Sequence, residues 1–345
     1  VSILDAVLKL IIVCILPYVS ADKLIIYGIM MTTVSVVDFC LYRFYCKKKF
    51  EDLKFDRVID RTLFASMLSF SGWNIFGSFA HMFRNQGLSL VLNSFWGTAI
   101  NAANGIAGQI NSAVNSLTAN FLTAIRPQMI KSYASGDMDY LMKMLYSTSK
   151  LTFYLVMVLA LPLILEIKPI LDLWLGVGCY PEKTISFCRL TILITLFDSF
   201  AVPISTIVHA SGKMKKFQIV CSSIILLIVP LAYISSKYGG TAEMTLVIGL
   251  IVTIIVQFVR LYLVGQIVSF SLTTYCKKVL LPTMAVFIVS MMTSVLIFRY
   301  IPTGITYVFI MSAITLFISI SSILSIGVNQ SERRIMAAFI KSKRL

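Results

Sequence analysis

The chain has 345 residues, of which 58% are hydrophobic and 13% are charged, and its mean hydropathy is +0.88. A soluble globule of this length needs more polar surface than such a composition supplies, so we predict a membrane protein. The formal net charge of +15 would suit a nucleic-acid-binding protein, but the positions of the basic residues explain it differently. No nucleic acid partner is expected.

Apolar runs long enough to cross a bilayer as helices recur along the chain, without the short alternating pattern of outer-membrane strands. We therefore expect an all-α polytopic membrane protein with about ten transmembrane helices. The predicted spans are approximately 1–19, 24–45, 62–95, 98–127, 149–167, 185–208, 217–237, 243–264, 279–298 and 305–326.

Lysine and arginine gather in every second predicted loop. About 21 of the 30 basic residues lie in these loops, as the positive-inside rule expects for cytoplasmic segments. The first span is therefore predicted to run outward and the C-terminus to be cytoplasmic. The basic segments are 43–61, 126–150, 213–216, 277–278 and 333–344.

The first ten residues, VSILDAVLKL, resemble neither a signal peptide nor a natural amino terminus, so we interpret the chain as part of a longer membrane protein. The connector CKKKFEDLKFDRVIDR, 46–61, spaces apolar residues among charges and is predicted to be an amphipathic helix on the cytoplasmic membrane surface. Two spans precede it. Six spans follow it, up to about residue 265, and then two more. The basic tail, 329–345, either rests on the inner leaflet or is disordered.

The span 62–95 contains the polar segment HMFRNQG, from His81 to Gly87. An arginine facing lipid near mid-depth costs at least ~2.5 kcal/mol, so Arg84 is expected at the outer interface or in an aqueous interior. In an interior, its forked donors with Asn85 and Gln86 would suit a phosphate or carboxylate. The alternative is a buried ion pair, for instance with Asp198.

The next span, 98–127, carries asparagines on one helical face. A helical wheel places Asn101, Asn104, Asn111 and Asn115 within roughly 80° of one another, opposite Ile106 and Ile110 on the same helix. Buried amides need partners, so this face either packs against another helix or lines a hydrated cavity. A wall of uncharged amides would suit a ligand rich in hydroxyl groups.

Asp198 lies near the middle of the span 185–208, five residues before Pro203. Intramembrane carboxylates are candidates for proton or cation coupling, and the alternative is a protonated or paired structural carboxylate. Prolines also interrupt other spans, which is weak evidence for moving parts. They are Pro162, Pro203, Pro230 and Pro282.

The remaining residues suggest no catalytic or metal chemistry. The seven cysteines are scattered without a CxxC motif, and a disulfide between Cys179 and Cys188 is not favoured. Two histidines at these spacings form no recognised metal site. No nucleophile with a base and no phosphate-binding loop is present, so neither an enzyme nor a cofactor is expected.

Three segments together resemble the Wzx-type flippases of O-antigen and capsule repeat units, in the multidrug/oligosaccharidyl-lipid/polysaccharide exporter superfamily. They are FSGWNIFGSFAHMFRNQG, LNSFWGTAINAANGIAGQINSAVNSLTANFLTAIRPQMIKSYASGD and IVHASGKMKKFQ. The resemblance covers essentially the whole chain, and NAANGIAGQ and IRPQMIKSYASGD are its most specific parts.

The resemblance implies two six-helix lobes around a central cavity, with about four N-terminal helices absent here. Residues 1–45 would end the N-terminal lobe, 46–61 would connect the lobes, and 62–265 would form the C-terminal lobe. Residues 266–328 would then be an additional helix pair. The helices carrying Arg84 and the asparagines would line the cavity.

The implied function is the flipping of undecaprenyl-diphosphate-linked oligosaccharides across the bacterial inner membrane by alternating access. The partners would be this lipid-linked oligosaccharide, membrane lipids and, as a candidate, the polysaccharide polymerase machinery. Two alternatives stay open. A drug/cation antiporter of the same superfamily would favour an acidic cavity around Asp198, and a membrane scaffold would transport nothing.

Overall fold

The computed structural model of the chain describes residues 2–16, 22–49, 60–268, 270–299 and 307–328. Within these ranges every regular element is helical, so the predicted all-α membrane fold is confirmed. The chain divides into two compact units, Val1–Phe64 and Ala65–Leu345. Most of the predicted connector, and the whole basic tail, lie outside the described residues.

The first unit contains α1, Ser2–Ile15, packed against α2, Lys23–Lys49. Helix α3, Arg61–Ala134, begins at the end of this unit and continues into the second. The other elements of the second unit are α4, Met138–Leu165; α5, Ile167–Leu175; α6, Thr184–Asp198; α7, Ala201–Ser211; α8, Met214–Leu226; α9, Ile228–Lys237; α10, Ala242–Gly265; α11, Leu272–Tyr275; η2, Cys276–Leu280; α12, Leu281–Phe298; α13, Val308–Ser322; and η4, Ile323–Gly327.

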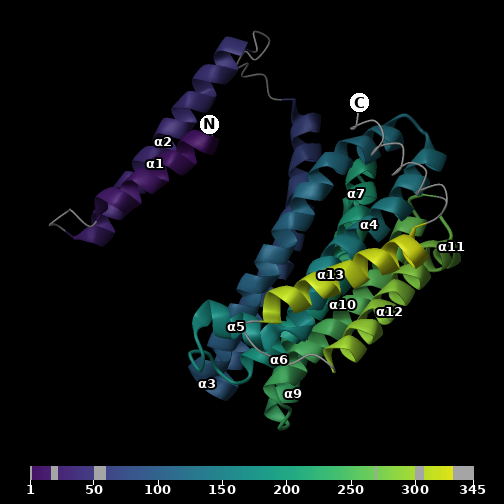
Figure 1. The fold of residues 1–345 in the computed structure, drawn as a ribbon. Coiled ribbons are helices and arrows are strands. Elements are labelled where there is room, and N and C mark those ends of the chain that lie inside the picture. The colour runs from purple at the N-terminus through teal and green to yellow at the C-terminus, as the bar shows by residue number, and fades with distance from the viewer. Residues whose placement is uncertain (1, 17–21, 50–59, 269, 300–306, 329–345) are drawn as a thin grey trace, which may run out of the picture. The chain divides into compact units, whose positions relative to one another are not determined.

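Helix α3 consists of two helical segments that meet at Gly97 (Figure 1). Gly97 has φ 79° and ψ −175°, a conformation that is open essentially to glycine alone. A straight helix would separate Ser89 and Asn101 by about 18 Å. Their side chains instead form a 2.7 Å hydrogen bond, so the chain reverses at Gly97. The reversal falls between the predicted spans 62–95 and 98–127.

Three further interruptions lie just before a proline, whereas Pro162 lies inside the continuous α4 and does not interrupt it as predicted. A proline ring clashes with the carbonyl four residues earlier. The break between α6 and α7 lies at Ser199 and Phe200, before Pro203, and the break between α8 and α9 lies at Leu227, before Pro230. Pro282 follows the π-helical η2 in the same way. Each pair of pieces still forms one apolar crossing.

Seven helices of the described chain are long and apolar enough to span a membrane, which makes the protein a multi-pass membrane protein. The three further spans predicted from the sequence fall on α1 and on the two segments of α3. Helix α1 is too short, and α3 contains no stretch that is apolar enough by the same measure. The polar side chains of α3 indicate that one side of it faces something other than lipid, while other side chains such as Leu68 and Ile75 are apolar and exposed.

The core of the second unit lies between α4, α6 and α10, and α12 and α13 pack against α4. Phe153 of α4 stacks on Phe200 with 5.0 Å between the ring centroids. The outer surface remains apolar: Ile255 and Phe258 of α10 and Phe309 of α13 are exposed. Such a surface suits contact with lipid tails.

Candidate functional site

Two cavities lie along the first segment of α3, and together they contain most of the predicted site residues. The first, which we call the amide cavity, has a volume of about 580 Å³. Both segments of α3 line it, with contributions from α6 and α10. Its lining residues are Arg84, Asn85, Gln86, Leu88, Ser89, Asn104, Gly105, Gly108, Gln109, Asn111, Ser112, Thr191, Ile194 and Leu246.

Five of the seven predicted substrate-binding residues therefore share one cavity, namely Arg84, Asn85, Gln86, Asn104 and Asn111. The reversal at Gly97 brings them together, because it folds the asparagine face of the second segment back beside the arginine of the first. Amides from both segments supply donors and acceptors without adding charge.

The other two predicted residues, Asn101 and Asn115, do not line this cavity. Asn101 accepts a hydrogen bond from the Ser89 hydroxyl at 2.7 Å and so fastens the two segments of α3. The Asn115 amide donates to the Asn111 side-chain oxygen at 2.7 Å. Asn101 thus lies in the contact between the two segments, and Asn104 and Asn111 line the cavity, whose hydration stays a prediction.

Asn111 also connects α3 to α6, because the Thr195 hydroxyl donates to its side-chain oxygen at 2.6 Å. On the opposite side of the same segment, Ala103 and Ala107 are fully buried and Ile110 is 8% exposed. The apolar side of the segment therefore packs on the core and its amide side borders the cavity.

Arg84 is partly buried, and its Nε atom is buried without a hydrogen-bond partner. Within the described ranges no carboxylate lies within ion-pair distance of its guanidinium. The charges of Asp198 and Arg260 act on it from a greater distance. A buried guanidinium donor without a partner is costly, and an anionic ligand in the cavity would satisfy it.

Asp198 pairs with Arg260 of α10, at 3.0 Å between Oδ1 and the guanidinium, and not with Arg84. The Arg260 side chain is 8% exposed and that of Asp198 is 38% exposed. Gln257, one turn earlier in α10, places its Oε1 atom 3.5 Å from Arg260. Asp198 was predicted to be either an ion-coupling residue or a paired structural carboxylate. The structure contains the paired carboxylate, and ion coupling stays a prediction.

The sequence analysis did not identify Arg260 or Gln257. Arg260 lies five residues before the end of α10, where a basic residue near the end of a span usually extends to the membrane surface. The sequence feature that could have identified Arg260 is that no other charged residue occurs between Glu243 and Gly265.

The second cavity, of about 510 Å³, contains this ion pair together with His81 and His209. It lies between α3, α6, α7, α8 and α10. Its remaining lining residues are Asn74, Gly77, Ser78, Ala201, Val202, Ser205, Phe217, Gln218, Cys221, Ser222 and Ile225. His81 precedes Arg84 by three residues, so one helical turn of α3 passes from this cavity to the amide cavity.

Glycines allow α3 to lie close to its neighbours at this position. A Cβ atom on Gly77 would lie 1.3 Å from the Gln218 side-chain nitrogen of α8, and one on Gly87 would lie 2.7 Å from Val229 of α9. A larger residue at position 77 would displace the end of the Gln218 side chain, and one at position 87 would press on the branched Val229 side chain of α9. The two glycines therefore help to position His81 and Arg84, which lie between them.

The charged cluster of Arg84, Asp198 and Arg260 carries one more positive than negative charge, and amides surround its unpaired member. In the described ranges no three His, Cys, Asp or Glu side chains are grouped as metal ligands would be. All seven cysteines are free, with Cys188 buried and Cys179 exposed. The arrangement can bind an anionic group at Arg84 and hydroxyl groups along the amides.

The chain matches no protein-family model, and no curated protein matches it.

Proposed function

We propose that this multi-pass membrane protein transports an undecaprenyl-diphosphate-linked oligosaccharide across the bacterial inner membrane by alternating access. One observation carries the proposal: Arg84 has a buried donor without a partner and lies in the same cavity as the amides of Asn85, Gln86, Asn104 and Asn111. A diphosphate requires a cation, and sugar hydroxyls require neutral donors and acceptors.

The ion pair separates the roles of the two arginines. Arg260 already has Asp198 as its counter-ion, so Arg84 is the arginine available to an incoming phosphate. The pair also weighs against a drug/cation antiporter, because a carboxylate that is neutralised by an arginine attracts a cationic drug weakly. Asp198 would be free for a proton or sodium ion only if Arg260 moved away during the cycle.

The decisive experiment deletes the gene in its parent organism and measures surface polysaccharide and the lipid-linked precursor. We expect the deletion strain to lose surface polysaccharide and to accumulate the precursor in the inner membrane, and the plasmid-borne gene to reverse both. Unchanged polysaccharide together with increased sensitivity to cationic dyes would instead favour the antiporter. Unchanged phenotypes in both assays would contradict transport of either class.

In the same strain, Arg84→Ala should abolish export, and Arg84→Lys should restore only part of it, because lysine lacks the forked donors. Arg299→Ala is the matched control, since Arg299 is exposed at the end of α12, away from both cavities. Membrane levels of each variant are measured by immunoblotting. Wild-type export by Arg84→Ala would contradict the assigned role of Arg84.

A further inference from the structure

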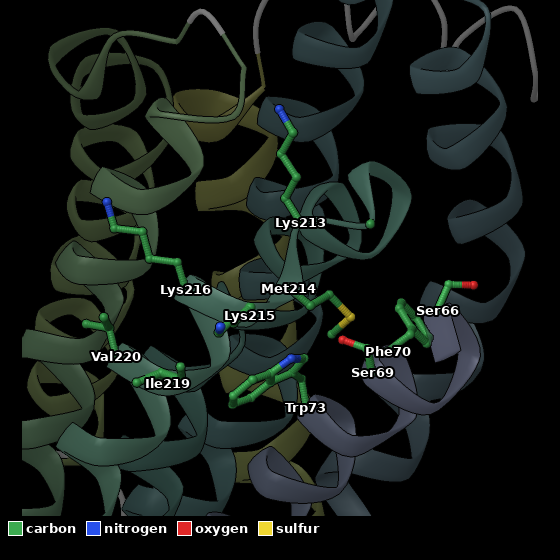
Figure 2. Close-up of a pocket in the computed structure, with 11 residues that line it drawn as sticks. Ser66, Ser69, Phe70, Trp73, Lys213, Met214, Lys215, Lys216, Ile219 and Val220 are labelled. Atoms are coloured by element: carbon green, nitrogen blue, oxygen red, sulfur yellow. The ribbon is translucent and has the colours of Figure 1, made fainter. Parts of the chain in front are cut away.

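A third cavity, which shares no lining residue with the two just described, lies between the beginning of α3 in this unit and the start of α8 with the loop before it. Its volume is about 690 Å³, and it is shown in Figure 2. Three lysines from one short stretch line it, namely Lys213, Lys215 and Lys216, and across from them lie Ser69 and Trp73 of α3. We call it the lysine pocket.

The lysine pocket holds three positive charges and no carboxylate. Its lining contains neither aspartate nor glutamate, and in the part of the chain that the structure describes none of the three lysines forms an ion pair. Lys216 donates to the neutral Gln266 side chain at 2.7 Å, and the Lys215 ammonium lies 5.6 Å from the Trp73 ring centroid. The pocket therefore attracts anions.

The opposite part of the pocket is apolar. Trp73 and Val220 are half-buried, and Phe70 and Ile219 are exposed. Figure 2 shows Lys213 and Lys216 extending in the same direction, away from Trp73. Lys213 lies in the short loop between two apolar crossings, Thr184–Ser211 and Met214–Lys237, and Lys215 and Lys216 lie in the first turn of the second crossing. The three lysines therefore mark the membrane interface, and the apolar wall lies deeper.

We propose that the lysine pocket binds the phosphate headgroup of an anionic phospholipid of the surrounding leaflet. The lysines contact the phosphate, the Ser69 hydroxyl donates to one of its oxygens, and the first carbons of the acyl chains lie against Trp73 and Ile219. Charge complementarity identifies the headgroup, and the adjoining apolar wall identifies a lipid rather than a free anion. The lipid is not the cargo, because this pocket lacks the amides that sugars require.

Trp73 supplies the probe. The chain has three tryptophans, so Trp96→Phe with Trp174→Phe leaves Trp73 as the fluorophore in the purified full chain. The protein is placed in two parallel series of phosphatidylcholine nanodiscs, one with increasing mole fractions of brominated phosphatidylglycerol and one with increasing mole fractions of brominated phosphatidylcholine. We expect the phosphatidylglycerol probe to quench Trp73 at a several-fold lower mole fraction.

Each change of Lys213, Lys215 or Lys216 to glutamine should reduce that preference by up to about fivefold. Lys215→Arg preserves the charge and should retain it, which separates charge from folding. The double variant Lys277→Gln and Lys278→Gln removes the basic pair of η2, where Lys278 lies over Tyr146, and should also retain it.

Three outcomes would overturn the proposal. Equal quenching by the two lipids would show that the pocket does not select anionic headgroups. An equal loss of preference in the Lys277 and Lys278 double variant would indicate general attraction to the basic surface. Suppression of quenching by inorganic phosphate, but not by chloride at the same ionic strength, would identify a free phosphate site instead.

Discussion

Helices α3 and α10 each contribute one arginine to the charged cluster, yet they do so in opposite settings. The first segment of α3 carries polar side chains among apolar ones, and its Arg84, whose Nε atom is buried without a partner, lines a cavity. Helix α10 is strongly apolar, and its Arg260 is buried against the carboxylate of Asp198. An arginine on a strongly apolar helix needs a counter-ion from the protein, whereas an arginine without such a partner can receive one from a ligand in the cavity that it lines.

Arg260 is thus a charge that stabilises the fold, whereas Arg84 is a charge that is available to a ligand. The ion pair of α10 fixes α6 against α10, and its removal should therefore affect stability first. The unpaired arginine of α3 should affect transport first. Stability measurements and transport measurements should accordingly rank the two arginines in opposite orders.

The largest expected effect on stability comes from Asp198→Ala, which leaves Arg260 buried without its counter-ion. We expect a loss of roughly 3 kcal/mol in unfolding free energy, at the low end for such pairs because Asp198 is partly exposed. The measurement is thermal unfolding in detergent. Combining Asp198→Ala with Arg260→Met should be less damaging than Asp198→Ala alone, because no orphan charge remains.

The matched control combines Asp198→Ala with Arg84→Met. Because Arg84 is not the partner in the structure, this second change should leave most of the loss in place. A larger rescue by Arg84→Met than by Arg260→Met would show that the pairing in the membrane differs from the one described.

An intermediate effect is expected at the reversal of α3. Gly97→Ala should cost about 1–2 kcal/mol, since φ of 79° with ψ of −175° is strained for any residue with a Cβ atom. No heavy atom lies near the added methyl group, so the cost is conformational. Gly72→Ala is the control: it lies inside the same helix with equally open surroundings and should be neutral or slightly stabilising. Equal stabilities of the two variants would contradict a sharp reversal.

The smallest effect is expected from single cysteine substitutions that test which side of the second segment of α3 is hydrated. In a background without the seven native cysteines, Asn104→Cys should react with a small water-soluble maleimide and Ile110→Cys should not. Asn101→Cys should react more slowly than Asn104→Cys, because it lies in the contact between the two segments. Equal protection of positions 104 and 110 would mean that the asparagines serve packing alone.

Patterns that act within one helix were predictable from the sequence. The helical character of each span, the boundary near Gly97 and the grouping of Asn104 with Asn111 follow from periodicity and from glycine and proline chemistry. The number of spans did not follow in the same way, because about ten were predicted and seven helices of the described chain are long and apolar enough to cross a membrane. The two segments of α3 are helices whose polarity, the property that marks a cavity wall, also lowers the hydropathy by which spans are recognised.

Partners across helices were not predictable. Asp198 and Arg260 are 62 positions apart, and no pattern in either segment indicates that they pair. Arg84 was therefore the candidate partner in the sequence analysis. Likewise, the asparagine face gave no indication that Ser89 would fasten Asn101 while Asn104 stayed at the cavity. Such pairings depend on how far each helix is rotated and shifted in the packed bundle, which the intrahelical pattern leaves open.

The ion pair lies beside the break between α6 and α7, where it can hold the crossing in one shape. Asp198 is the last residue of α6, immediately before the break, whereas Arg260 belongs to the uninterrupted α10. The ion pair thus holds the end of α6, next to the break, against the continuous helix α10. Any bending of the crossing at this break would strain the contact between Asp198 and Arg260 as long as the pair is intact. The ion pair would therefore oppose bending of this crossing.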